Sequence, residues 1–199
     1  SDKYEGDAAY DVDLLTGASD VDAGETATLS VDKVTYAVDG AESSSMLPAG
    51  VTRDGATLRV DPTSAAFDSL AVDETQEIVV SYDVVDANGL RVSQTATITV
   101  TGTNDAPVVS EAVVSAKDEG DAAYEVDLLT GASDVDAGET ATLSVDKVIY
   151  AVNGAESSSA LPAGVTRDGA TLTVDPTSAA FDSLAAGQTQ EIVVSYDVV

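Results

Sequence analysis

Residues 90–100 have the sequence LRVSQTATITV, in which apolar side chains alternate with polar, mostly hydroxyl-bearing ones. Val92, Ala96, Ile98 and Val100 fall on one face of an extended chain, and most of the polar residues fall on the other. A period of two is typical of a strand with one face in a core and the other in water. The sequence therefore predicts a half-buried β-strand here.

The same alternation recurs elsewhere, and turn residues such as Pro, Gly and Asp separate the alternating segments. Further strands are expected at residues 77–84, 26–31, 34–38, 10–15 and 56–60. The inward parity switches near Asp32 and Lys33, which predicts a bulge or a turn there. About seven short strands in roughly 110 residues predict an all-β, immunoglobulin-like β-sandwich.

An internal repeat sets the domain organisation. Residues 5–85 recur at 119–199 without a gap, and only eight of the 81 aligned positions differ. The offset has the length of a domain rather than of a solenoid unit. We therefore expect two tandem β-sandwiches, residues 1–105 and 106–199. The second repeat lacks the counterpart of the final strand, and the unequal repeats suggest a segment of a longer array.

The charge balance restricts the function classes. The chain has 36 acidic and 8 basic residues, a formal charge of −28, and no Cys, His or Trp. This composition excludes disulfides, thiolate or imidazole metal sites and histidine-dependent catalysis. It also disfavours binding to nucleic acid and to anionic membrane surfaces. No apolar run is long enough for a membrane helix, so we expect no direct membrane insertion.

The carboxylates are clustered, most clearly in the segment ASDVDAGE at 18–25, which recurs at 132–139. An Asp-x-Asp motif in a loop places two carboxylates on one side of the chain. Oxygen ligands without nitrogen or sulfur select Ca²⁺ or Mg²⁺, and a flexible cluster favours Ca²⁺. A solvated acidic turn is the alternative interpretation. The segment TGTNDAPVV at 101–109 suits a short extended linker, in which Asn104 and Asp105 supply oxygens.

A family resemblance supports the calcium interpretation. The segments GATL at 55–58, FDSL at 67–70 and SQTATITVTGTNDAP at 93–107 resemble the VCBS-type, cadherin-like repeats of giant bacterial RTX adhesins. The resemblance extends over essentially the whole chain. It implies a secreted protein of the bacterial cell surface, exported by a type I system. Stacked, calcium-loaded sandwiches in such proteins extend ligand-binding domains from the cell in adhesion and biofilm formation.

The similarity to cadherins implies a calcium junction between consecutive repeats, made from an Asp-x-Asp motif, the linker and acidic residues of the preceding repeat. In this chain the implied ligands are Asp134, Asp136, Asn104, Asp105, Glu5, Asp68 and Asp86. The equivalents Asp20, Asp22 and Glu119 would serve junctions with neighbouring repeats outside this segment. Two features depart from cadherins, because the segment at 67–70 lacks the second acid of its motif and the linker lacks one ligand.

These observations predict a non-enzymatic, calcium-rigidified spacer that contacts neighbouring repeats, and that reaches other cells or surfaces through domains outside this segment. The alternative is a glycan- or cell-binding β-sandwich module of the same adhesin, although most of the few aromatic residues have core parity. A glycosidase that uses paired carboxylates is disfavoured by the lack of Trp and His and of any unique constellation. An acidic DNA mimic is disfavoured because the carboxylates lie with loop motifs.

Overall fold

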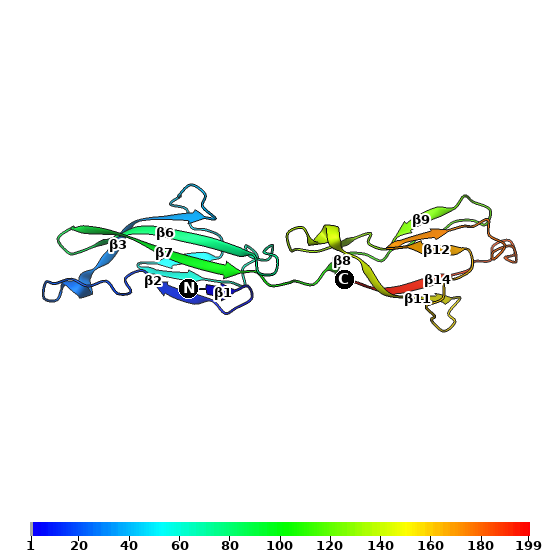
Figure 1. The fold of residues 1–199 in the computed structure, drawn as a ribbon, viewed down its shortest axis with the longest axis horizontal. Coiled ribbons are helices and arrows are strands. Elements are labelled where there is room, and N and C mark those ends of the chain that lie inside the picture. The colour runs from blue at the N-terminus through cyan, green and yellow to red at the C-terminus, as the bar shows by residue number, and fades with distance from the viewer. Residues whose placement is uncertain (1) are drawn as a thin grey trace. The chain divides into compact units, whose positions relative to one another are not determined.

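The computed structural model describes residues 2–199 and divides into two compact units, unit 1 (Ser1–Asp105) and unit 2 (Ala106–Val199). Most regular structure in the described residues is β-strand, and the helices are single 3-10 turns, η1 (Glu25–Thr28) and η2 (Glu139–Thr142). The predicted all-β class is therefore confirmed (Figure 1). Neither of these turns, nor any other described segment, forms a helix long and apolar enough to cross a membrane.

Unit 1 is a sandwich of two sheets. The larger sheet has the order β1–β7–β6–β3 and the smaller one β2–β5–β4. Strand β1 runs parallel to β7, and all other neighbours are antiparallel. Seven strands arranged as a sheet of four facing a sheet of three form an immunoglobulin-like sandwich. The strands are β1 (Asp2–Tyr4), β2 (Tyr10–Asp13), β3 (Ser30–Val38), β4 (Val51–Asp54), β5 (Thr57–Val60), β6 (Thr75–Val85) and β7 (Arg91–Thr101).

The core of unit 1 follows from the alternation in β6 and β7. Ile78 and Val80 of β6 and Ile98 and Val100 of β7 are fully buried, as their parity predicts. Each such side chain contributes about 1.5–3 kcal/mol through burial of apolar surface. Val92 has the same parity but is exposed. Val92 lies near the turn of the β6–β7 hairpin, which extends past the three-stranded sheet (Figure 1).

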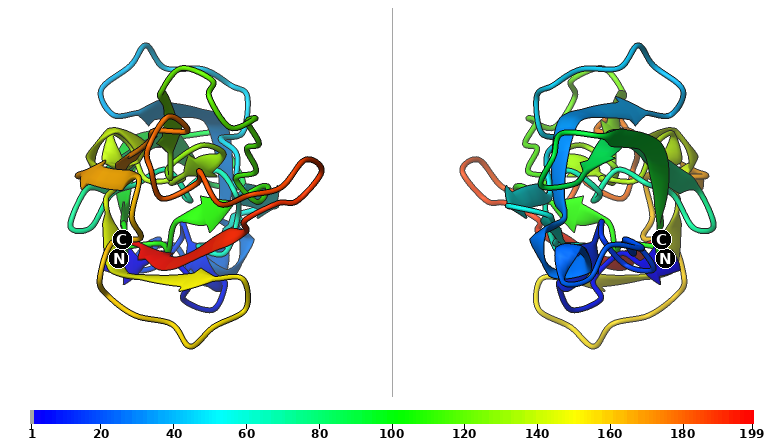
Figure 2. Two further views of the ribbon diagram at one scale, coloured as in Figure 1. Left: turned by 90° about the vertical axis from the view of Figure 1, so that its right-hand side faces the viewer. Right: turned by 90° about the vertical axis from the view of Figure 1, so that its left-hand side faces the viewer.

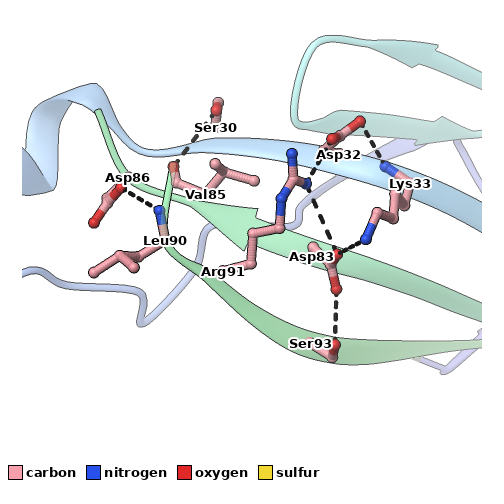
Figure 3. Close-up of polar contacts among 9 residues, drawn as sticks. All are labelled: Ser30, Asp32, Lys33, Asp83, Val85, Asp86, Leu90, Arg91 and Ser93. Atoms are coloured by element: carbon pink, nitrogen blue, oxygen red, sulfur yellow. Dashed lines mark hydrogen bonds and ion pairs between the residues drawn. The ribbon is translucent and has the colours of Figure 1, made fainter. Parts of the chain in front are cut away.

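The predicted parity switch is a β-bulge in β3. The register between β3 and β6 shifts between Asp32 and Thr35, and Lys33 has a φ of 50°. Lys33 Nζ lies 3.1 Å from Asp83 Oδ2, and Ser93 Oγ donates a hydrogen bond to Asp83 Oδ1 at 2.7 Å (Figure 3). The hydrogen bond from Ser93, with a smaller contribution from Lys33, holds the pKa of Asp83 below its usual range.

Arg91 of β7 joins this group across the sheet. Its Nη1 donates to Asp32 Oδ2 at 2.6 Å and lies 3.8 Å from Asp83 Oδ2 (Figure 3). The hydrogen bond from Arg91 is also the main cause of the lowered pKa of Asp32. The bulge is therefore held by side chains from three neighbouring strands.

The strand expected at 26–31 is wrong in its first half, where the structure has η1. Gly24 adopts a left-handed conformation with a φ of 88°, and Glu25 N then donates to Asp22 O. Thr28 Oγ1 donates to Glu25 O at 2.8 Å. A hydroxyl that bonds to nearby backbone competes with strand pairing. Period-two alternation alone does not reveal this competition.

Unit 2 repeats part of this arrangement, with β9, β11, β12, β13 and β14 as the counterparts of β2, β3, β4, β5 and β6. Its sheets have the orders β12–β13–β9 and β11–β14, and a short antiparallel pair joins β10 and β8. In Figure 2, β14 lies beside β11, with which it pairs. The strands are β8 (Val108–Val109), β9 (Tyr124–Asp127), β10 (Ala132–Ser133), β11 (Val145–Val152), β12 (Val165–Asp168), β13 (Thr171–Val174) and β14 (Ile192–Val198).

One buried hydrogen bond ties the two sheets of unit 1 together. Tyr82 Oη donates to Leu14 O at 2.8 Å, and Tyr196 makes the equivalent bond to Leu128 in unit 2. Replacing Tyr82 by Phe leaves the carbonyl of Leu14 without this donor. We expect the free energy of unfolding of unit 1 to fall by about 1 kcal/mol in urea titrations at neutral pH.

The same variant tests a pH dependence. Burial, with a smaller effect of the Asp13 charge, raises the pKa of Tyr82 above its ordinary value of 10.0. The folded state then keeps a proton that the unfolded chain releases, so this stabilising contribution is present below pH 10 and is lost as the pH rises through the raised pKa. Tyr82→Phe should therefore lose less stability than the wild type above pH 10. An identical alkaline slope in both proteins would contradict this assignment.

Candidate metal centre

The acidic loop of unit 2, residues 134–139, is held in place by its own backbone and by one threonine. Asp134 N donates to Thr140 Oγ1 at 2.8 Å, and the same hydroxyl donates back to Asp134 O at 2.9 Å. Asp136 N donates to Asp134 Oδ1 at 3.0 Å, and Gly138 has the positive φ that starts η2. These bonds turn the loop so that its acidic side chains converge.

Three carboxylates meet in this loop. Asp134, Asp136 and Glu139 each place one oxygen so that the three atoms lie within 4.8 Å of one another. Asp136 is only 2% exposed, which is unusual for an aspartate. Burial, together with the charges of Asp136 and Asp134, raises the pKa of Glu139 above its usual range. Such a cluster can hold a metal ion, because a cation relieves both the repulsion and the cost of burial.

Unit 1 contains the same loop with one added contact. Asp20, Asp22 and Glu25 also converge within 4.8 Å, with the same turn bonds from Asp20 N to Thr26 and from Asp22 N to Asp20. Here Asp22 is exposed. Asn88 Nδ2, from the turn between β6 and β7, donates to both carboxylate oxygens of Glu25 at 3.1 and 3.3 Å. The two loops are therefore similar in backbone but differ in burial and in partners.

The chain enters unit 2 beside its acidic loop. Strand β8 begins two residues after Ala106 and pairs with β10, with Val108 opposite Ser133. Ser133 directly precedes Asp134. Ser110 continues this contact, because its N and Oγ both donate to Gly131 O, at 2.9 and 3.1 Å. The linker end of unit 2 and the carboxylates of residues 134–139 are thus held close together within the unit.

Segments that carry other expected ligands meet in unit 1, at the end of β6 and β7 that lies away from the β6–β7 turn. Glu5 Oε2 accepts a hydrogen bond from Thr103 N at 3.2 Å. Gly102 packs against the carbonyls of Leu70 and Ala71, where any side chain would collide. Half-buried Asp68 lies in the turn that precedes Leu70. The segments that carry Glu5, Asp68 and the start of the linker are therefore neighbours.

The remaining linker ligands have local contacts. Asn104 is exposed, and its Nδ2 donates to Asp105 O. Asp105 is half-buried, and Glu119 is exposed in a turn of unit 2. The expected junction would draw Asn104 and Asp105 together with Asp134 and Asp136, which belong to the other unit. That grouping stays a prediction.

The expected place of Asp86 among these residues is wrong. Asp86 follows β6 at the end where Val85 pairs with Arg91, whereas Glu5 and Thr103 lie near the pair Thr75–Thr101. Ten residue steps of about 3.3 Å separate the two ends. Asp86 Oδ1 instead accepts from Asn88 N and Leu90 N, at 2.9 and 2.8 Å, and so closes its own turn. Figure 3 shows the bond from Leu90.

Glu25, Glu139 and Asn88 were not identified as site residues from the sequence. Each glutamate follows the first aspartate of its loop by five residues, and this spacing is the same in both repeats. The 3-10 turn after Gly24 or Gly138 folds the glutamate back toward the aspartates, which a strand would not do. Asn88 could be found only from the long register of β6 and β7.

A charge-neutralising substitution tests the electrostatic repulsion among the carboxylates in the loop of unit 2. In excess chelator at neutral pH, we expect Glu139→Gln to stabilise unit 2, because it removes one of three converging charges. The raised pKa of Glu139 means that the wild type regains this stability as the pH falls toward and below 4.5, so the difference between the proteins should vanish there. Thermal unfolding followed by amide signals of unit 2 measures it.

Glu25→Gln is the matched control, because Asn88 already donates to that carboxylate. In chelator, its gain in stability should be smaller or absent. If Glu139→Gln destabilised unit 2 in chelator at neutral pH, repulsion among the three carboxylates would not be destabilising the loop.

Matches to known proteins are found among solved structures and not among family models or curated proteins. No protein-family model matches the chain, and no curated protein matches it. Similar solved structures include immunoglobulin domains 1–5 of Sidekick-1, at 16% identity and a TM-score of 0.27, and the I-band fragment I67–I69 of titin, at 13% and 0.29. They cover 100% and 98% of this chain, which spans only 38% and 61% of theirs. At these values they carry no argument about function, and the fold rests on the order of the sheets.

Proposed function

We propose that this chain is a pair of non-enzymatic spacer repeats whose acidic loops bind Ca²⁺, and that the ion in the loop of unit 2 stiffens the joint between the repeats. The observation that carries the proposal is the convergence of three carboxylates beside the linker end of unit 2. Two sandwiches with 73 identical residues among 81 support a spacer role, because a spacer needs length rather than varied sites.

Ca²⁺ is the ion that the ligands favour. Each cluster offers only carboxylate oxygens, which are hard ligands. Backbone carbonyls and water can complete the six to eight ligands that Ca²⁺ accepts in flexible geometry, whereas Mg²⁺ demands a near-ideal octahedron. Each bound ion supplies two positive charges to a loop that carries three negative ones.

The resemblance to adhesin repeats supports a role at the bacterial surface. In our proposal the repeats belong to a secreted adhesin and project its ligand-binding domains from the cell, in adhesion and biofilm formation. Neighbouring repeats of the same chain are the direct partners. Two domains joined by a linker move relative to one another by default, and a bound ion at the linker would restrict that motion.

Small-angle scattering of the whole chain tests the stiffening. We expect a narrow distribution of intramolecular distances in about 10 mM Ca²⁺, well above the dissociation constants of extracellular modules, and a broader one in excess chelator. The double variant Asp134→Asn/Asp136→Asn should give the broad distribution under both conditions. The matched pair Asp20→Asn/Asp22→Asn should keep the response to calcium, because that loop would serve a joint outside these two repeats. A distribution indifferent to calcium, or an equal loss in both variants, would overturn the proposal.

A further inference from the structure

Two of the three asparagines of the chain are followed by glycine, in the pairs Asn88–Gly89 and Asn153–Gly154, and both pairs lie in exposed turns. In such a pair the backbone nitrogen of the glycine can attack the side-chain carbonyl carbon of the asparagine. Glycine favours this attack because it has no Cβ to obstruct the approach and its backbone is flexible. The chain therefore has two places where an asparagine can lose its amide without an enzyme.

The reaction needs water and no other reagent. At the first pair, a bond forms between Gly89 N and Asn88 Cγ while the bond from Cγ to Nδ2 breaks. The proton of Gly89 N leaves with Nδ2 as ammonia, and a cyclic imide remains. Water then opens the imide at either of its carbonyls and gives aspartate or isoaspartate. Both products carry one new carboxylate, which is ionised at neutral pH.

The turn that contains Asn88 is held by exchangeable contacts. Gly89 N donates to Asp86 O at 3.3 Å, which is longer than an ordinary backbone hydrogen bond. The side-chain amide of Asn88 donates to the carboxylate of Glu25 in an exposed contact. Contacts between exposed side chains contribute little because water competes for the same groups. The nucleophile and the amide can therefore both leave their partners while unit 1 stays folded.

Asn153 is held by the backbone and uses its side-chain oxygen. Asn153 N donates to Glu191 O, and Asn153 Oδ1 accepts from Glu191 N, both at 2.9 Å. The corresponding residue of unit 1 is Asp39, which has the same φ of 49° and accepts from Glu77 N at 2.8 Å. An aspartate thus fits this turn as well as an asparagine does, because only the oxygen makes the contact.

The contact of Asn88 depends on its side-chain nitrogen instead. Asn88 Nδ2 donates to both carboxylate oxygens of Glu25, at 3.1 and 3.3 Å. An ionised aspartate has no donor, so after deamidation two carboxylates would face each other here. Glu25 already converges with Asp20 and Asp22 within 4.8 Å. The same reaction that is structurally silent at Asn153 would therefore replace an attraction by a repulsion at residue 88.

We propose that the Asn88–Gly89 turn is a site of spontaneous deamidation, and that its product loosens the acidic loop of unit 1, residues 20–25. The turn joins β6 to β7, so this one side-chain contact links the hairpin to the loop. The reaction adds one negative charge and is irreversible in water. It converts unit 1 from a form in which the hairpin holds the loop to a form in which the two repel each other.

Peptide mass spectrometry tests the modification, on the whole folded chain aged at mildly alkaline pH in excess chelator. Conversion at Asn88 should be at least roughly threefold faster than at Asn153, whose Oδ1 must first leave its bond to the backbone. Asn104 is a further control in the same sample, because it is also exposed but precedes an aspartate. Its conversion should be at least roughly tenfold slower than that of Asn88, because the residue that follows it has a side chain.

Substitutions test the consequence for the loop. In chelator at neutral pH, Asn88→Asp should lower the unfolding temperature of unit 1 by about 2–5 °C. Asn153→Asp is the matched control and should leave the unfolding temperature of unit 2 unchanged, because unit 1 has an aspartate in the same turn. The double variant Glu25→Gln/Asn88→Asp should regain the loss, because the amide at residue 25 can then donate to the carboxylate at residue 88.

Three results would overturn the proposal: conversion at Asn88 that is no faster than at the two control asparagines, an Asn88→Asp variant as stable as the wild type, or a double variant that stays as destabilised as Asn88→Asp. Because each measurement is made in chelator, none of these results depends on the proposed calcium sites. A chain that fails to respond to calcium would overturn the proposed function alone.

Discussion

Ile78→Ala is expected to lower the free energy of unfolding of unit 1 by about 2–5 kcal/mol. Ile78 is fully buried and lies opposite Ile98, which is also fully buried, so the deletion leaves a cavity that two close-packed sheets cannot fill. Denaturant titrations in which amide signals report each unit separately measure this loss.

The second repeat supplies the matched variant. Ile192 has the same sequence neighbours as Ile78 but is only half-buried, and no strand pairs with the outer edge of β14 within the described residues. Ile192→Ala should therefore cost unit 2 less than about 2 kcal/mol. Val21→Ala, at a fully exposed side chain, should change stability by less than about 0.5 kcal/mol. Equal losses at Ile78 and Ile192 would show that β7 adds little to the core of unit 1.

Calcium is expected to give the other large effect. Extracellular modules bind Ca²⁺ with dissociation constants of about 10⁻⁴–10⁻³ M. At a hundredfold excess over that constant, one site that exists only in the folded state adds about 2.7 kcal/mol to the free energy of unfolding. We therefore expect both units to unfold at higher temperature in calcium than in chelator.

Carboxylate-to-amide variants assign this effect to the loops. Asp134→Asn/Asp136→Asn should remove the calcium-dependent gain from unit 2 and leave it in unit 1, and Asp20→Asn/Asp22→Asn should do the reverse. Mg²⁺ at the same concentration should give a smaller gain, because it dehydrates reluctantly and demands a stricter geometry. If calcium still raised the unfolding temperature in both variants, or raised it only as much as added NaCl does, the effect would reflect screening of the net charge rather than binding at a calcium site.

Period-two alternation predicted much of the fold. It located β7 and β6 to within two residues and, through the change of parity at Asp32 and Lys33, the bulge in β3. It failed at residues 26–28, because a left-handed glycine and a threonine hydroxyl redirect the backbone into η1 without changing the alternation. Local backbone chemistry of this kind is invisible to a pattern of apolar residues.

The acidic site was predictable only in part. The spacing of Asp134 and Asp136 pointed to the loop, because adjacent residues in a turn stay together whatever the fold. Glu139 was missed because its approach depends on η2, and Asn88 because its approach to Glu25 depends on the length of the β6–β7 hairpin. Asp86 was misplaced for the same reason, since sequence proximity to the last strand does not tell which end of that strand a residue occupies.

A calcium titration of the whole chain, followed by amide signals of the two acidic loops, shows directly whether these loops bind Ca²⁺. We expect saturable shifts at residues 20–25 and 134–139 with midpoints of about 10⁻⁴–10⁻³ M, each abolished by the Asp→Asn pair in its own loop. The amides of exposed Asp54 and Asp168, outside the clusters, serve as internal controls. Shifts in the loops that stay linear and no larger than those of the controls would contradict a calcium site.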